Sequence, residues 1–384
     1  RALNANSWEN NRLGLKKPPL SYNQFGGVLS GPVYLPRIYN GRNRTFFTFS
    51  LENNSDKAPR TRQARVPTQL ERGGDFSQTL NRRGAAGLEV YDPWSTTGSG
   101  TGAKRTLFPG ARLPASSLNP TGVAVAKAYP LPNLARPAQI GADNWAGNGV
   151  YQVLEDQQSI RIDQVVSSRQ RMFGRFSRLK RQDEFVPVFF PGVLSFPTEG
   201  QSDLGLSYRN FYSVALDDTI TFTPTLVGSV RYGLSYRYLP KWLGLAADGR
   251  TLADPSVLNL APVILQNQAT KAFPILNMGE RIIQMGGRED VENWYTHTVL
   301  TTFYKMVRNH SLKFGTDYRL NRWNKIYLGD GQSGSFAFSS VFTQANPSVP
   351  TTADTSGSGL ASLLLGVPAS GSLGYDSPLA RQHH

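Results

Sequence analysis

The segment Phe222–Tyr238, FTPTLVGSVRYGLSYRY, decides the fold because its side chains alternate between two kinds. Its even positions carry the apolar and aromatic side chains Leu226, Val230, Tyr232, Leu234, Tyr236 and Tyr238. Its odd positions carry the polar and cationic side chains Ser229, Arg231, Ser235 and Arg237. Successive side chains of a β-strand point to opposite faces, so the segment predicts a strand with one apolar face and one cationic face.

Composition excludes several classes of protein. The chain has 384 residues, of which 39% are hydrophobic and 18% are charged, so its composition is not that of a disordered chain. No apolar run approaches the length of about 18 residues that a membrane-spanning helix needs, and the longest, Leu360–Val367, is far shorter. The formal net charge of +14 suggests a basic face or an anionic partner, such as nucleic acid, lipopolysaccharide or an anionic solute. The absence of cysteine excludes a disulfide framework.

Other strand-like segments come in pairs that predict hairpins. The pairs are Ser159–Val166 with Gln170–Leu179, Tyr208–Phe222 with Leu226–Tyr238, and Trp294–Val307 with Ser311–Trp323. These segments exceed the usual strand length of about 5–6 residues and suit transmembrane strands of about 9–11. The connections within a pair are short, whereas those between pairs are long. Outer-membrane barrels show this alternation of short periplasmic turns and long extracellular loops.

The alternation places most charges of these segments on one face, which we expect to line a lumen. A lipid-facing Arg or Lys near the midplane of a bilayer costs about 2–4 kcal/mol. Asp218 breaks the pattern, and a bulge or a position near the rim would account for it. Aromatic residues gather near strand ends, as Tyr236, Tyr238 and Trp242 do, which fits an aromatic girdle at a membrane surface. Aromatic packing in a soluble β core is the alternative.

These patterns predict an all-β fold: an incomplete antiparallel transmembrane β-barrel of about ten strands, with long extracellular loops. We divide the chain into first barrel strands at 1–51, a long extracellular loop region at 52–150, and barrel hairpins with long outer loops at 151–384. The middle region is rich in Arg, Pro, Gly and Ser and lacks a sustained period.

Five arginines have the parity expected for a lumen and are the candidate binding residues, namely Arg161, Arg175, Arg231, Arg237 and Arg319. They could attract an anionic solute, or they could simply form ion pairs within the lumen. The arginines of Thr61–Arg83, in the outer loops, are a second candidate surface for substrate or lipopolysaccharide.

Catalytic and metal-binding groupings are not evident in the sequence. The histidines are His297, His310, His383 and His384, and none is accompanied by acidic residues at a ligand spacing. The glycine-rich stretch Gly98–Lys104 lacks the spacing of a phosphate-binding loop. We therefore expect no enzymatic activity, no cofactor and no metal site.

Several phrases of the sequence, in order from end to end, resemble the Oar-like TonB-dependent transporters of the Gram-negative outer membrane. They are Asn23–Val33 (NQFGGVLSGPV), Tyr39–Glu52 (YNGRNRTFFTFSLE), Val66–Ser77 (VPTQLERGGDFS), Tyr91–Pro93 (YDP), Phe108–Pro114 (FPGARLP), Tyr129–Asn133 (YPLPN), Arg161–Gln164 (RIDQ) and Gly359–Pro368 (GLASLLLGVP), together with the turn in Phe222–Gly233. The resemblance implies a barrel, commonly of 22 strands, that is closed by an N-terminal plug and energised through a TonB box.

The chain departs from that pattern because it shows no signal peptide, TonB box, plug or terminal strand with an aromatic carboxylate end. An incomplete barrel would leave unpaired edges in lipid, so we expect the chain to be part of a larger protein or a truncated product. The partners expected are outer-membrane lipid and lipopolysaccharide, an unidentified solute, and the TonB complex through a plug outside this chain.

Three functions remain open at this point. The first is TonB-dependent uptake of a bulky solute such as an oligosaccharide, a peptide or a metal chelate. The second is a surface or adhesion protein with the same barrel but without transport. The third, a soluble basic β protein that binds nucleic acid, predicts solubility without detergent and steeply salt-dependent binding.

Overall fold

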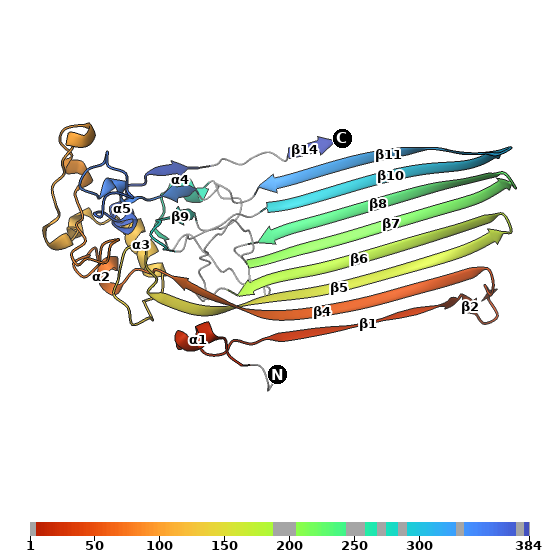
Figure 1. The fold of residues 1–384 in the computed structure, drawn as a ribbon, viewed down its shortest axis with the longest axis horizontal. Coiled ribbons are helices and arrows are strands. Elements are labelled where there is room, and N and C mark those ends of the chain that lie inside the picture. The colour runs from red at the N-terminus through yellow and green to blue at the C-terminus, as the bar shows by residue number, and fades with distance from the viewer. Residues whose placement is uncertain are drawn as a thin grey trace.

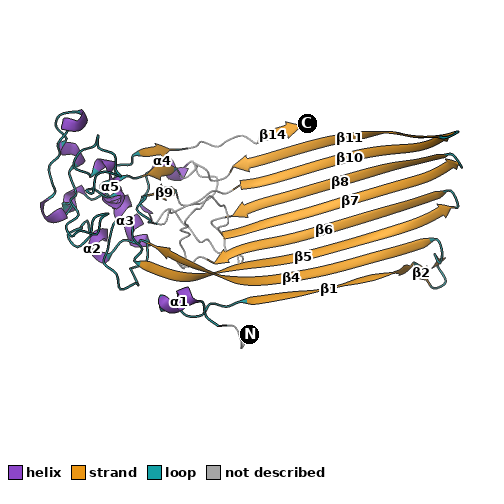
Figure 2. Ribbon diagram, in the orientation of Figure 1, coloured by secondary structure: helices purple, strands orange, loops and turns teal. Residues whose placement is uncertain are grey.

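A single large sheet dominates the fold. The computed structural model describes residues 5–186, 205–242, 258–266, 274–282, 290–327, 334–373 and 380–383. Nine strands follow the order β1-β4-β5-β6-β7-β8-β10-β11-β14, and each pairs antiparallel with its neighbours. They lie side by side, while helices and irregular segments gather beyond one end of the sheet (Figure 1, Figure 2).

The strands of this sheet confirm the predicted hairpins and extend beyond them. Their bounds are β1 Ser21–Pro32, β4 Thr45–Ala64, β5 Trp145–Ser167, β6 Gln170–Val186, β7 Gly205–Thr223, β8 Leu226–Trp242, β10 Asp290–Val307, β11 His310–Tyr327 and β14 Ala380–His383. The three predicted pairs are the hairpins β5–β6, β7–β8 and β10–β11. The all-β antiparallel class is therefore confirmed.

The tight turns of the three hairpins share the end of the sheet that lies away from the helices (Figure 1). A short ribbon of β2 (Tyr34–Leu35) and β3 (Tyr39–Asn40), in the connection from β1 to β4, lies at the same end. Short connections thus occupy one rim of the sheet and long connections occupy the other, as the sequence predicts.

Strands β4 and β5 reach further toward the long connections than their neighbours do. Their ladder runs from Thr45↔Gln164 to Ala64↔Trp145. They therefore continue into residues 52–64 and 145–150, which were expected from the sequence to belong to a loop region. Whether the chain divides into domains at 1–51, 52–150 and 151–384 stays a prediction. Backbone hydrogen bonds between β4 and β5 stabilise this extension, although its side chains do not alternate between apolar and polar.

Three of the long connections, those from β4 to β5, from β8 to β10 and from β11 to β14, pack together into one body. We call residues 65–144, 258–266, 274–282 and 334–373 the loop body. Its helices are α2 Gln69–Arg72, α3 Pro120–Ala128, α4 Pro262–Gln266 and α5 Gly359–Leu364. Its 3₁₀ turns are η1 Pro93–Ser95, η2 Gly100–Gly102, η3 Pro109–Ala111, η4 Ala115–Ser117 and η6 Ser340–Phe342. A small sheet, β13-β12-β9, joins Ser370–Ser372, Ser335–Ala337 and Ile275–Asn277.

The loop body has a hydrophobic core to which all three connections contribute. Fully buried members include Val66, Phe76, Val125, Leu258, Met278, Leu360 and Leu364. Helices α3 and α5 approach backbone to backbone, because a Cβ added at Gly122 would lie 2.2 Å from the Leu363 carbonyl oxygen. The longest apolar run of the sequence supplies α5 and is a buried core helix. No helix in the described part of the chain is long and apolar enough to cross a membrane.

The first helix, α1 (Trp8–Arg12), lies against the extended part of β4. Ser7 caps its N-terminus, because the Ser7 side chain accepts a hydrogen bond from the Asn10 backbone. Thr61 donates to the Asn10 side chain over 2.8 Å, and Gln63 donates to Glu9 over 2.7 Å. These contacts tie the beginning of the chain to the long-connection end of the sheet.

Candidate functional site

One face of the sheet is apolar through its middle, as the alternation in the sequence predicts. Strand register places these side chains on it: Phe47, Phe49, Ile160, Ile162, Phe176, Val214, Leu216, Val230, Tyr232, Leu234, Val299, Phe314, Tyr318 and Leu320. We call this surface the apolar face. Leu216 and Tyr318 are 50% and 60% exposed. The described chain therefore leaves the apolar face without a cover, unlike the inner layer of a soluble sandwich.

Stacked aromatic side chains border the apolar face on the side of the long connections. The Tyr236 ring stacks on Tyr212 with centroids 5.9 Å apart and on Tyr295 with centroids 4.5 Å apart. Toward the short turns, Phe303 stacks on Phe314 at 5.5 Å. The eight residue steps from Tyr295 to Phe303 span about 27 Å of strand, or about 20 Å along a membrane normal at the usual barrel tilt. This spacing fits two interfacial girdles around a hydrocarbon layer.

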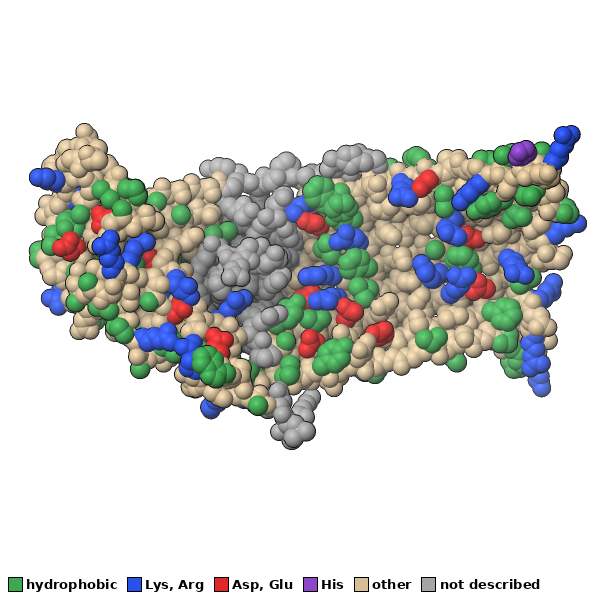
Figure 3. Space-filling model, viewed as in Figure 1, with side chains coloured by type: hydrophobic (Ala, Val, Ile, Leu, Met, Phe, Trp, Pro, Cys, Tyr) green, Lys and Arg blue, Asp and Glu red, His purple; other side chains and the backbone are tan. Residues whose placement is uncertain are grey.

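The opposite surface, which we call the polar face, carries all five candidate arginines. Arg161 lies directly across from Arg175, and Arg231 lies across from Asp217. Basic and acidic side chains lie close to one another over this face of the sheet, with hydrophobic side chains among them (Figure 3). The structure thus brings the five arginines to one surface, but spreads them over several strands instead of gathering them at one point.

Four of the five arginines have a partner within the chain. Arg161 forms a bidentate pair with Asp163, at 2.7 and 2.6 Å, and its guanidinium lies 3.8 Å from the centre of the Phe173 ring. Arg231 donates to Asp217 over 2.8 Å. The remaining partners are Asp317 for Arg319 and the Phe211 and Trp294 rings for Arg237.

Arg175 differs from the other candidates. Within the described part of the chain it has no hydrogen bond, ion pair or ring contact, and its side chain is exposed. Its direct neighbour across the ladder, Arg161, carries the same charge, and like charges placed opposite each other are unfavourable. Arg175 is therefore the one of the five candidate arginines that is most available to an anionic group from outside the chain.

A second charged cluster, nearer the loop body, lies on the same face. Asp183 is buried and accepts hydrogen bonds from Arg181 over 2.8 Å and from the Tyr151 hydroxyl over 2.6 Å. Arg209 lies 3.3 Å from the same carboxylate, and Arg181 also reaches Glu155 at 3.4 Å. Such pairs have a signal in the sequence that differs from a catalytic or metal-binding motif. Arg and Asp two residues apart on a strand share a face, as in Arg181–Asp183.

Polar side chains on the apolar face are hydrogen-bonded to one another. The Tyr232 hydroxyl lies 2.9 Å from His297 Nδ1, and Arg178 pairs with Asp156 at 3.2 Å. The exception in the sequence pattern, Asp218, is on the apolar face and accepts from the Gln170 side chain over 2.9 and 3.1 Å. The ladder irregularity of β7–β8 falls between Thr221 and Thr223, so no bulge removes Asp218 from this face.

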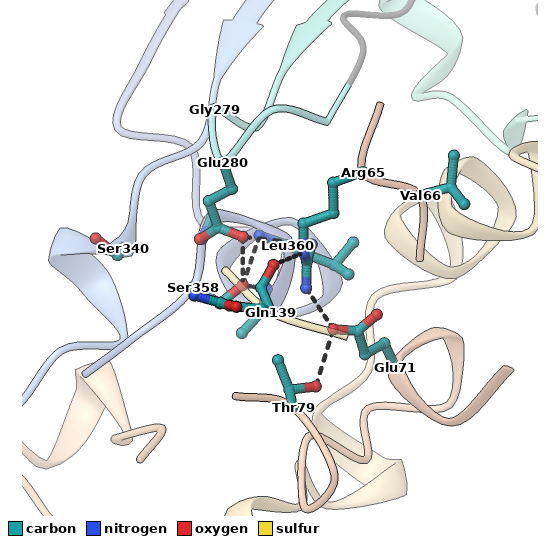
Figure 4. A network of polar contacts seen from close by, with 12 residues as sticks. Arg65, Val66, Glu71, Thr79, Gln139, Gly279, Glu280, Ser340, Ser358 and Leu360 are labelled. Carbon is teal, nitrogen blue, oxygen red and sulfur yellow. Dashed lines mark hydrogen bonds and ion pairs between the residues drawn. The ribbon is translucent and has the colours of Figure 1, made fainter. Parts of the chain in front are cut away.

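The loop body is held together by a buried ion network around Arg65 (Figure 4). The Arg65 guanidinium pairs with Glu71, lies 3.5 Å from a Glu280 oxygen, and donates to the Gln139 carbonyl over 3.1 Å. Thr79 donates to Glu71 over 2.9 Å. Arg65 and Glu71 are fully buried. One cation thus joins segments that are far apart in the sequence.

Glu280 continues this network to α5. Its carboxylate accepts from the Gly359 backbone over 2.6 Å and from the Ser358 hydroxyl over 3.1 Å. Both Glu280 and Arg281 have positive φ, at 57° and 62°, a backbone region that non-glycine residues rarely adopt. Burial raises the pKa of the Glu280 carboxyl above its ordinary value, and the Arg65 charge opposes that shift.

Burial corrects the expectation for two of the arginines of Thr61–Arg83. Arg65 is fully buried and Arg72 is 9% exposed, with its guanidinium donating to the carbonyls of Tyr129 and Pro130. Neither can reach a ligand in solution. Arg82 and Arg83 are exposed and remain on the outer surface.

Histidines and acidic residues do not gather into a metal site in the described ranges, where no group of three potential ligands is found. His297 pairs with Tyr232, and His310 begins β11 beside a tight turn. His383 ends β14, and His384 lies outside the described residues.

Comparison with known protein families identifies a match to the whole chain. A family model described as an outer membrane beta barrel domain matches residues 1–384, the whole chain. No curated protein and no solved structure matches the chain. The match agrees with a long-stranded meander that has an apolar, aromatic-bordered face and a charged face.

Proposed function

We propose, from the premise that the chain belongs to the outer membrane beta barrel domain family, that it forms the barrel region of a TonB-dependent transporter. The family places the chain in an outer membrane as a β-barrel, and the apolar face then contacts lipid. Transport of a bulky solute, such as an oligosaccharide, a peptide or a metal chelate, is our inference. The Oar-like phrases of the sequence support the dependence on TonB and a Gram-negative source.

The main support for the proposal is the charged character of the polar face. If the apolar face contacts lipid, the polar face lines the lumen of the barrel. Its ion pairs keep charges at fixed positions along the strands. Asp217 and Asp183 are buried by their arginine partners, so the wall is built and rigid. Arg175 adds a cation that no described side chain neutralises. Such a wall suits passage of a polar or anionic solute.

The loop body supports a role in capture. It is a packed structure with its own core at the outer end of the barrel wall, so it can present a preformed surface to a solute. Trp94 and Leu131, at 63% and 50% exposed, are among its outward-facing apolar side chains. Exposed aromatic groups on a rigid body are suited to stacking on sugars or on apolar parts of peptides.

Uptake assays in the source cells test the proposal. Deleting the gene should abolish accumulation of one class of solute, and so should removing TonB or collapsing the proton-motive force. Restoring the gene with Arg175→Ala should lower uptake about tenfold, the effect of losing one interaction with a charged group. Arg319→Ala is the matched control, because Arg319 shares the face but is already paired with Asp317. Unchanged uptake of every solute class after deletion would contradict transport.

The second candidate, a surface or adhesion protein of the same barrel type, is favoured by the size and order of the loop body. It predicts that gene deletion changes attachment or surface assembly and leaves uptake intact. The outer-membrane location of the family does not fit the third candidate, a soluble protein that binds nucleic acid.

A further inference from the structure

The apolar face contains a groove that has a carboxylate at one end. The groove has a volume of about 550 Å³, and its lining includes Ile162, Met172, Gly174, Leu216, Asp218 and Tyr232. Gly174 lies between Ile162 and Leu216 in the ladder, so the missing side chain creates the depression between two bulky neighbours. The next rung toward the short turns places Met172 beside Asp218.

Asp218 has no cationic partner among the described residues, although most strand aspartates do. The other acidic side chain described on the apolar face, Asp156, pairs with Arg178. Asp218 accepts only the Gln170 amide, which is neutral. An ionisable group in a lipid-facing position is costly and generally acquires a partner. The described residues supply none here, which leaves the carboxylate open to a cation from the surroundings.

The position of Asp218 indicates which component of the membrane could supply the cation. Its rung includes Val230 and Thr301, and the stacked pair Phe303–Phe314 belongs to the adjacent rung on the side of the short turns. Asp218 thus lies just inside the girdle nearest the turns. The groove continues from Asp218 away from the girdle, toward the middle of the hydrocarbon layer. A lipid with its head at the girdle would extend its acyl chain in that direction.

We propose that this groove binds a phospholipid with a primary ammonium headgroup, in the leaflet next to the short turns. The ammonium group donates to the Asp218 carboxylate, and an acyl chain fills the groove over Gly174. Charge complementarity selects the headgroup, because a carboxylate favours an ammonium and disfavours an anionic headgroup without one. The inference rests on the outer-membrane location of the chain and does not depend on transport.

Native mass spectrometry of the complete purified protein tests the proposal. The delipidated protein is titrated with equal amounts of an ethanolamine phospholipid and a glycerol phospholipid with the same acyl chains. The wild type should retain the ethanolamine lipid about fivefold better, the ratio expected for one partly solvated ion pair. Asp218→Asn keeps the volume and removes the charge, so the ratio should fall to about one. Asp317→Asn, on the polar face, should leave the ratio unchanged.

A second variant tests the groove itself. A Cβ at Gly174 would meet the Leu216 side chain at 3.4 Å, an ordinary contact, so Gly174→Val can fold. It should lower retention of both lipids while leaving their ratio above one. Gly27→Val is the control, since Gly27 lies on the same face in open space. Equal retention of the two lipids by the wild type would overturn the proposal, as would a preference that survives Asp218→Asn.

Discussion

Replacing Arg65 by methionine tests whether the buried network holds the loop body together. Methionine is unbranched like the stem of arginine and carries no charge, so Arg65→Met leaves Glu71 and Glu280 buried without their cation. Removing one partner of a buried ion pair typically costs about 3–5 kcal/mol, because the remaining charge stays desolvated. At about 1.4 kcal/mol per tenfold, the loop body should open at least a hundred times more often.

Hydrogen exchange measures this opening segment by segment. Amides of residues 66–79, 276–282 and 358–365 should lose protection together, because the network joins these three segments. Protection in the middle of β7 and β8 should not change, since these strands lie outside the loop body. Arg112→Met is the matched control. Arg112 pairs with Asp75 at 3.0 Å but is 64% exposed, and an exposed pair contributes about 0–1 kcal/mol.

The reasoning would be refuted if Arg65→Met and Arg112→Met had the same small effect. A combined variant sharpens the test further. Adding Glu71→Gln and Glu280→Gln to Arg65→Met removes the uncompensated charges, so it should recover part of the lost protection. Failure to recover would mean that packing around Arg65, and not its charge, stabilises the loop body.

Two other predictions concern single positions. Burial raises the pKa of the Glu280 carboxyl, so the folded loop body keeps the carboxyl proton to a higher pH than the unfolded chain does. The stability that this proton contributes is fully present below the ordinary pKa of 4.5 and is lost as the pH rises through the folded pKa. Glu280→Gln should flatten the pH dependence of urea unfolding of the loop body above pH 4.5, and an unchanged slope would assign that dependence to another group. Gly315→Ala should destabilise the barrel by about 2 kcal/mol or more, because its Cβ would lie 2.0 Å from the Thr301 carbonyl oxygen. Gly233→Ala is the control, because its Cβ would lie 3.8 Å from the Thr298 Cβ, and this variant should retain the heat-modifiable gel migration of the wild type. Equal migration of the Gly315→Ala and Gly233→Ala variants would contradict the predicted clash at Gly315.

The hairpins could be predicted from the sequence because a bilayer imposes a strict alternation. Tyr232 and Leu234 must face hydrocarbon while Arg231 faces water, so the period of two is visible without any tertiary information. The same alternation placed the five arginines on one face. It could not show how far strands extend, because beyond Glu52 both faces of β4 carry mostly polar side chains and the period disappears.

The loop body could not be predicted for a different reason. Its core joins residues that are hundreds of positions apart, such as Val66 and Leu360, and no local pattern encodes such contacts. Arg65 resembles a surface residue in the sequence, since its burial depends on Glu71 and Glu280 arriving from separate segments. The available cation, Arg175, is also a product of register, because only the pairing of β5 with β6 sets it against Arg161.

The uninterrupted β4–β5 ladder has a consequence for protein engineering. It runs from the short-turn rim to Ala64 and Trp145, both of which are buried in the core of the loop body. A chimera that exchanged outer segments at the membrane surface would interrupt the β4–β5 ladder and separate the loop body from the strands that hold it. Exchange points at residues 64 and 145 would keep the β4–β5 ladder intact. The barrel of one protein could then carry the loop body of another in a defined orientation.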